Sequence, residues 1–129
     1  MKKEKMKILL VDDEMSMLAL IKRTLEKREF TVVTASSGEE ALVEFKKGGF
    51  DLVLLDINME GFNGIQTLKK MKEFNSGALV IMLTGAHDEK IAKKCFALGA
   101  NNFLTKPFNE QQFDMALTMS KFLNKNVDK

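Results

Sequence analysis

The chain has 129 residues, of which 45% are hydrophobic, and this size and composition are typical of one globular domain. Its net charge of +2 is uneven, because four lysines and one glutamate give residues 1–7 a charge of +3. We interpret this segment as a solvated leader and expect no direct contact with nucleic acid. No apolar stretch reaches the ~20 residues of a membrane span, and the single cysteine, Cys95, excludes an intramolecular disulfide. We therefore expect a cytoplasmic protein without membrane contact.

Strand and helix signals alternate five times along the chain. Short aliphatic or β-branched runs predict strands, and the stretches between them carry apolar residues at helical spacing. The expected strands are Lys7–Val11, Phe30–Ala35, Leu52–Leu55, Ala78–Leu83 and Asn102–Thr105. The expected helices are about Glu14–Lys27, a helix with a Ser37–Glu40 capping box that ends at Gly48-Gly49, about Ile65–Phe74, Asp88–Leu98, and a last helix from an Asn109 cap to about Leu123. The polar residues 124–129 are expected to fray as a tail.

The arrangement of the strands follows from their apolar character. The first, third and fourth strands are uninterrupted apolar runs, which indicates burial on both faces and a parallel sheet covered by helices. Right-handed crossovers allow two common strand orders. With five strands and five helices, we expect the flavodoxin-like doubly wound α/β fold with the order 2-1-3-4-5. The first and third strands are neighbours in this order, so their carboxyl ends meet at the switch point.

Polar side chains stand where these strands end. Asp12 and Asp13 follow the first strand, Asp56 the third, Thr84 the fourth and Lys106 the fifth. The carboxyl ends of parallel strands lie along one edge of a sheet, so three carboxylates, a hydroxyl and an ammonium should converge there. Clustered carboxylates remain ionised most easily around a cation, and Mg²⁺ prefers hard oxygen ligands. We expect Asp13 and Asp56 to bind the metal directly and Asp12 to act through a water.

The same residues suit a phosphoryl group. A carboxylate such as Asp56 is a competent covalent acceptor, and phosphoryl transfer then needs mainly positioning and charge neutralisation. The metal and Lys106 would neutralise charge, Thr84 can donate its hydroxyl to a phosphoryl oxygen, and a backbone carbonyl near Asn58 can add a metal ligand. Each residue alone also has an ordinary explanation, such as a turn aspartate or a solvated lysine. The joint pattern is what indicates a site.

Four motifs resemble the receiver domain of bacterial response regulators. They are Val11-Asp12-Asp13-Glu14, Leu55-Asp56-Ile57-Asn58-Met59 with Gly61 and Gly64, Leu83-Thr84-Gly85, and Phe103-Leu104-Thr105-Lys106-Pro107-Phe108. The motifs have the order and spacing of the family, and the resemblance covers about residues 6–123, between the basic leader and the polar tail. It implies Mg²⁺-dependent phosphotransfer to Asp56 from a sensor histidine kinase or a histidine phosphotransfer domain. Asp12, Asp13, Asp56 and Asn58 are the implied metal site.

The resemblance also implies how the domain works. It would be a switch that catalyses only its own phosphorylation and dephosphorylation, and would signal to a downstream protein through the surface of its last two helices and last strand. Phe103 takes the position of the switch aromatic, the Lys106–Pro107 bond is expected to be cis, and Asn63 replaces a frequent aspartate without a clear consequence. Met15 and Met17, at the start of the first helix, would belong to the surface that docks the kinase or the phosphotransfer domain.

Three alternatives remain beside this interpretation. A haloacid-dehalogenase-like phosphatase also uses an aspartyl phosphate and Mg²⁺, but its nucleophile belongs to a first-strand Asp-x-Asp, whereas Asp56-Ile57-Asn58 ends the third strand. A flavodoxin-type module would need a phosphate loop where Asp12-Asp13-Glu14 would repel a phosphate. A receiver-fold interaction module that is not phosphorylated is the third alternative. The leader and short tail favour a stand-alone single domain over residues 1–129, and a phosphorylation-dependent homodimer is compatible with the resemblance.

Overall fold

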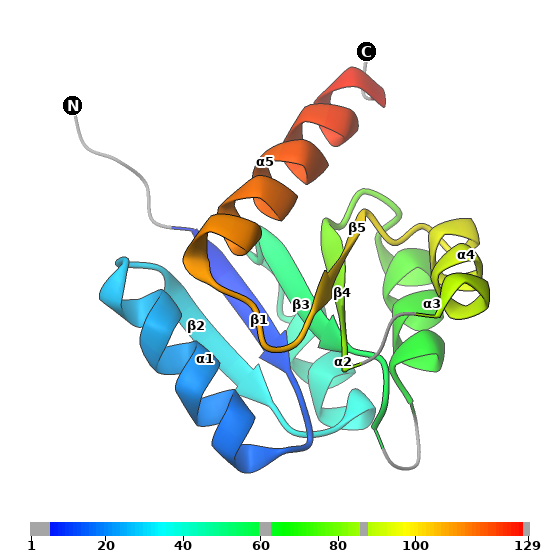
Figure 1. Cartoon of the computed structure of the whole chain (residues 1–129). Helices are drawn as coiled ribbons and strands as arrows, with labels where there is room; N and C mark the ends of the chain where they lie inside the picture. The colour runs from blue at the N-terminus through cyan, green and yellow to red at the C-terminus, as the bar shows by residue number, and fades with distance from the viewer. Residues whose placement is uncertain (1–5, 60–62, 86–87, 128–129) are drawn as a thin grey trace.

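Five parallel strands form one sheet in the order β2-β1-β3-β4-β5 (Figure 1). The computed structural model describes residues 6–59, 63–85 and 88–127, of which residues 122–127 are described in backbone only. The strands are β1 Lys7–Val11, β2 Thr31–Ala35, β3 Leu52–Asp56, β4 Val80–Thr84 and β5 Asn102–Thr105. The helices are α1 Met15–Lys27, α2 Gly38–Lys46, α3 Gly64–Phe74, α4 Glu89–Ala97 and α5 Glu110–Val127. The expected fold class, strand order and alternation of elements are confirmed.

Two helical layers cover the sheet, one on each face (Figure 1). Side chains alternate across a strand, so Ile8 and Leu10 of β1 pack with α1 and α5, whereas Leu9 and Val11 pack with α2, α3 and α4. All four of these side chains are fully buried. The apolar runs that predicted a doubly covered sheet therefore supply two separate cores, and Cys95 is buried in the second of them.

The helix caps differ in detail from the prediction. Ser37 caps α2 as expected, because its hydroxyl accepts a hydrogen bond from the backbone N–H of Glu40 (3.1 Å). The Glu40 carboxylate, however, accepts from the backbone N–H of Ser36 (2.7 Å), so the reciprocal bond of a capping box lies one residue earlier. We expected no clear consequence of Asn63 at this position. In the structure Asn63 caps α3 in a full capping box with Gln66.

The last helix is longer than expected. We predicted an end near Leu123 and a frayed tail, but α5 continues to Val127. The residues after Leu123 include no glycine or proline, so no helix-breaking residue ends the helix there. Gly61 of the second motif lies outside the residues that the structure describes.

Candidate metal and phosphoryl site

Three carboxylates meet at the carboxyl end of the sheet. Asp12 and Asp13 follow β1 and Asp56 is the last residue of β3, and these strands are hydrogen-bonded neighbours with Val11 opposite Leu55. One carboxylate oxygen from each aspartate lies within 4.8 Å of the others. Asp12 and Asp56 are buried, whereas Asp13 is exposed. The cluster therefore has two fixed carboxylates at its base and one at its mouth.

Lys106 brings the only positive charge among the residues described around this cluster. Its ammonium donates to Asp12 Oδ2 at 2.9 Å and lies 3.4 Å from Asp56 Oδ1. Its backbone N–H donates to the carbonyl of Thr84 (2.7 Å), so Lys106 starts at the carboxyl edge of the sheet, and its side chain points toward the acidic pair. Its peptide bond to Pro107 is cis, as expected.

Backbone groups hold the two buried carboxylates in place. The N–H of Glu14 donates to Asp12 Oδ1 at 3.0 Å, and the N–H of Asn58 donates to Asp56 Oδ1 at 3.3 Å. Gly64 closes in behind Asp56, because a Cβ on Gly64 would lie 2.1 Å from the Asp56 carbonyl oxygen. The sequence singled out Gly64 only as a family turn residue, and the close approach explains why a side chain cannot stand there.

The charges of the site are unbalanced. Burial and, after it, the charge of Asp12 raise the pKa of the Asp56 carboxyl to about 6, although Lys106 and the Asn58 N–H partly offset both effects. Burial opposes the charged form of Lys106, yet the hydrogen bond to Asp12 and the attraction of Asp56 together raise the Lys106 pKa above its usual value. The two buried carboxylates thus share one ammonium, and the carboxylate of Asp13 lies close to both. A hard divalent cation matches both the missing charge and the all-oxygen donor set.

The remaining predicted residues lie at the same edge. Thr84 ends β4 and is 6% exposed, and the adjacent Gly85 lines an open hollow of about 300 Å³ together with Asp13, Asn58 and Lys106. This one hollow is lined by five of the predicted site residues, Asp12, Asp13, Asp56, Asn58 and Lys106, and Thr84 lies next to it in the chain.

Phe103 connects this edge to α4. It lies on β5 opposite Met82, is half-buried, and packs on the α2, α3 and α4 side of the sheet. Its ring centroid is 5.3 Å from that of Phe96 on α4. A movement of Phe103 would therefore directly change its packing against Phe96 of α4.

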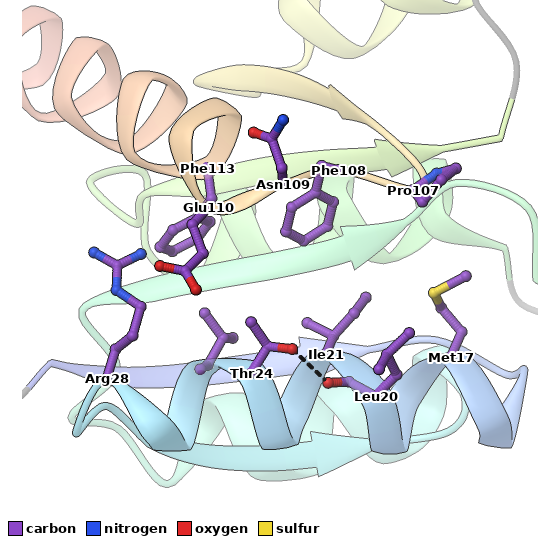
Figure 2. Close-up of a pocket in the computed structure, with 11 residues that line it drawn as sticks. Met17, Leu20, Ile21, Thr24, Arg28, Pro107, Phe108, Asn109, Glu110 and Phe113 are labelled. Atoms are coloured by element: carbon purple, nitrogen blue, oxygen red, sulfur yellow. Dashed lines mark hydrogen bonds between the residues drawn. The ribbon is translucent and has the colours of Figure 1, made fainter.

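An apolar groove of about 140 Å³ adjoins the hollow, between α1 and the first turn of α5 (Figure 2). Met17 and Pro107 line both the groove and the hollow. Along the groove, Leu20 and Ile21 of α1 face Phe108 across the gap (Figure 2). Leu20 is 58% exposed, which is high for a leucine, and sequence reasoning did not single it out because it lies outside the apolar stripe of α1.

The strand order and this set of side chains define a class, the flavodoxin-like phosphoacceptor domains of signalling proteins. Within it, the model of the response regulator receiver domain family matches residues 8–118, and the chain belongs to this family. It is accordingly a phosphoacceptor signalling domain and a switch rather than a classical enzyme, and the phosphatase and flavodoxin-type alternatives are not favoured.

Three known proteins illustrate the similarity. The chemotaxis protein CheY of Halobacterium salinarum is 38% identical over 80% of this chain and 86% of its own length. The transcriptional regulatory protein CpxR of Escherichia coli (strain K12) is 42% identical over 82% of this chain but only 45% of its own length, so the chain spans less than half of CpxR. A chain in the CheX-CheY-BeF3-Mg²⁺ complex of Borrelia burgdorferi has a TM-score of 0.84 and 32% identity, covering 91% of this chain and 89% of that one.

Among the described residues, no helix combines the length and the apolar character that crossing a membrane requires.

Proposed function

We propose that Asp56 accepts a phosphoryl group from a sensor histidine kinase or a histidine phosphotransfer domain, in a reaction that requires Mg²⁺. The observation that carries this proposal is the position of Asp56 itself. Its carboxylate is buried beside the Lys106 ammonium and two further carboxylates, at the base of a hollow open to a donor. The same site would also catalyse hydrolysis of its own phosphoryl group, and no other substrate is proposed.

The metal would be held by Asp12, Asp13, Asp56 and a backbone oxygen near Asn58. Asp13 is the exposed member of the cluster and can take a ligand position without rearrangement of the buried pair. Mg²⁺ supplies charge neutralisation for the incoming phosphoryl group. The crowding of the three carboxylates supports this assignment, since it leaves an excess of negative charge that Lys106 alone does not balance.

The covalent step is a displacement at phosphorus. A carboxylate oxygen of Asp56 forms the new P–O bond while the P–N bond to the donor histidine breaks and the ring nitrogen leaves. Lys106 already lies within 3.4 Å of Asp56, so its ammonium can donate to an oxygen of the phosphoryl group. Thr84 can donate its hydroxyl to a second phosphoryl oxygen, and Gly85 leaves room for the group because it has no side chain.

The donor would dock on the apolar groove between α1 and α5. Met17 and Pro107, labelled in Figure 2, line both the groove and the hollow. A helix laid along the groove would therefore bring a histidine to Asp56. Flexible methionines suit an adaptable contact surface. The complex of the Borrelia relative with CheX supports the view that this kind of domain works through protein partners.

The domain would signal to its partner through the face formed by α4, β5 and α5. Phe96, Met115 and Met119 on this face's helices are 49%, 61% and 53% exposed, which offers apolar area to a downstream protein or to a second phosphorylated copy. A cytoplasmic location and the lack of direct nucleic-acid contact belong to the same proposal, and the modest net charge of +2 supports the latter.

The test is the mass of the protein after incubation with Mg²⁺ and a small acyl phosphate. The wild type should gain one phosphoryl group, and Asp56→Asn should gain none because it lacks the nucleophile. Asp51→Asn is the matched control, since Asp51 is an exposed aspartate just before β3, at the opposite end of the strand, and should leave the gain intact. A full gain in Asp56→Asn would place the acceptor elsewhere.

A further inference from the structure

A second partly buried lysine, Lys72, lies near the amino-terminal end of the sheet, away from the phosphoryl site. It is in the last turn of α3, and its ammonium donates to the carbonyl of Ala78 and to Asn101 Oδ1 (3.2 Å). Within the described residues, no carboxylate lies within ion-pair distance of Lys72. Its partners are therefore neutral oxygens from two different connections, the loop before β4 and the turn before β5.

Asn101 extends this contact into the sheet. Its side-chain oxygen also accepts from the N–H of Val80 (2.8 Å), and its own N–H donates to the Val80 carbonyl (2.8 Å). Asn101 thus joins the start of β4 to the start of β5, and the Lys72 ammonium joins both to the end of α3. These contacts make one connected hydrogen-bond group at the base of β4 and β5.

The aliphatic stem of Lys72 packs against the end of α4. Gly99 follows the last residues of α4 with φ +103°, and a Cβ on Gly99 would lie 3.2 Å from Lys72 Cδ and Cε. The N–H groups of Gly99 and Ala100 donate back into α4, to Phe96 and Cys95. The carboxyl end of α4 is therefore held between its own last turn and Lys72.

The rest of α4 is less buried than the other helices. Cys95, a small residue near the carboxyl end, is the one buried residue of α4, whereas α1, α2 and α3 each have three or four buried residues. Ile91 and Leu98 are half-buried. The amino end of α4 lies at the carboxyl edge of the sheet, where Thr84 ends β4, so the lightly packed end is the one nearer the phosphoryl site.

We infer that Lys72 and Asn101 form a clamp that fixes the carboxyl end of α4, so that α4 turns about this end when the domain switches. The inference rests on the proposed function for the switching event, whereas the clamp is a property of the resting protein. Burial also lowers the pKa of Lys72, as expected for an ammonium held by neutral oxygens without an acid.

The first arm of the test uses amide hydrogen exchange in the resting protein. Lys72→Met keeps the stem against Gly99 but removes both donated hydrogen bonds, so the amides of Ala100 and Asn101 should exchange at least about tenfold faster. Lys70→Met, at an exposed lysine two residues earlier on the same helix, is the matched control and should exchange like the wild type. Asn101→Asp keeps an oxygen that can accept from both Lys72 and the Val80 N–H, and should retain the protection. Unchanged exchange in Lys72→Met would overturn the clamp.

The second arm compares amide NMR shifts with and without beryllofluoride and Mg²⁺. In the wild type, shifts should be large around Lys90 and small from Leu98 to Asn101. In Lys72→Met the shifts from Leu98 to Asn101 should grow to match those around Lys90, because the fixed end is lost. Small shifts there in the mutant would overturn the pivot while leaving the clamp. If the amide shifts of α4 do not change even in the wild type, both the proposed output surface and the pivot are wrong. The hydrogen-exchange experiment then still tests the clamp independently.

Discussion

At the scale of single residues, the site depends on how burial and charge act on the same few side chains. Burial of the Asp56 carboxyl, followed by its poorly screened repulsion from the buried Asp12, raises the pKa of Asp56 to about 6. Lys106 offsets part of this repulsion through two short contacts. Asp13 adds a third carboxylate at the mouth of the cluster. A cation bound among the three carboxylates would reduce their repulsion.

We therefore predict opposite effects of Asp13→Ala with and without Mg²⁺. Mg²⁺ binds the folded site and not the unfolded chain, so saturating metal should raise the wild-type melting temperature, with about 2.7 kcal/mol expected at one hundred times the dissociation constant. Asp13→Ala should lose this rise, and in EDTA it should melt at or above the wild-type temperature because carboxylate repulsion is reduced. Calorimetry with and without Mg²⁺ measures both. An Mg²⁺-induced rise that persists in Asp13→Ala would assign the metal to other ligands.

At the scale of elements, the helix starts nearest the site are held by short-range hydrogen bonds. Asn63 and Gln66 form a capping box at the start of α3, directly after the loop that follows Asp56. Asn109 and Gln112 exchange the same pair of bonds at the start of α5, directly after the Lys106–Pro107 segment. Each cap satisfies N–H groups that would otherwise lack partners, so the chain turns sharply away from the site at a defined residue.

Asn63→Ala should lower the free energy of unfolding by about 1 kcal/mol, because the α3 N–H accepted by Asn63 loses its partner. For a domain of this size that corresponds to a melting temperature about 4 °C lower. Asn63→Asp keeps the accepting oxygen and places a negative charge at the helix start, so it should retain wild-type stability. Urea titrations of the three proteins provide the measurement. Equal stability of Asn63→Ala and the wild type would mean that α3 is held by its packing alone.

At the scale of the whole molecule, the sheet connects the phosphoryl site to the output face. Thr84 lies opposite Thr105 in the β4–β5 register, and Phe103, two residues before Thr105, contacts Phe96 on α4. A dianion on Asp56 should draw Thr84 toward it, and Phe103 should fill the space that Thr84 leaves. Charge-assisted hydrogen bonds from Thr84 and Lys106 can supply a few kcal/mol, which shifts a two-state equilibrium by two or more decades.

Thr84→Ala should separate phosphorylation from switching. The variant keeps Asp56 and Lys106, so it should still gain one phosphoryl mass, but without the hydroxyl it should lose most beryllofluoride-induced amide shifts around Phe103 and α4. NMR is the suitable measurement because the chain contains no Trp or Tyr. Thr105→Ala removes an exposed hydroxyl at the paired position on β5 and should respond like the wild type. Full distant shifts in Thr84→Ala would show that the coupling follows another route.

The sequence by itself determined the fold class, the strand order and the edge of the sheet at which the candidate site lies. These follow from local signals, since an apolar run predicts a buried strand wherever it lies, and topology rules then place the run ends at one edge. The tertiary structure decided which groups pair there. Lys106 and Asp12 are 94 positions apart, and Lys72 and Asn101 are 29 apart. The close approach of Gly64 to Asp56 likewise depends on how separate elements pack together. So does the position of Met17, which lines both the groove and the hollow. A local sequence pattern indicates the secondary structure and burial that each residue favours. A contact between distant residues also depends on where the fold places the partner.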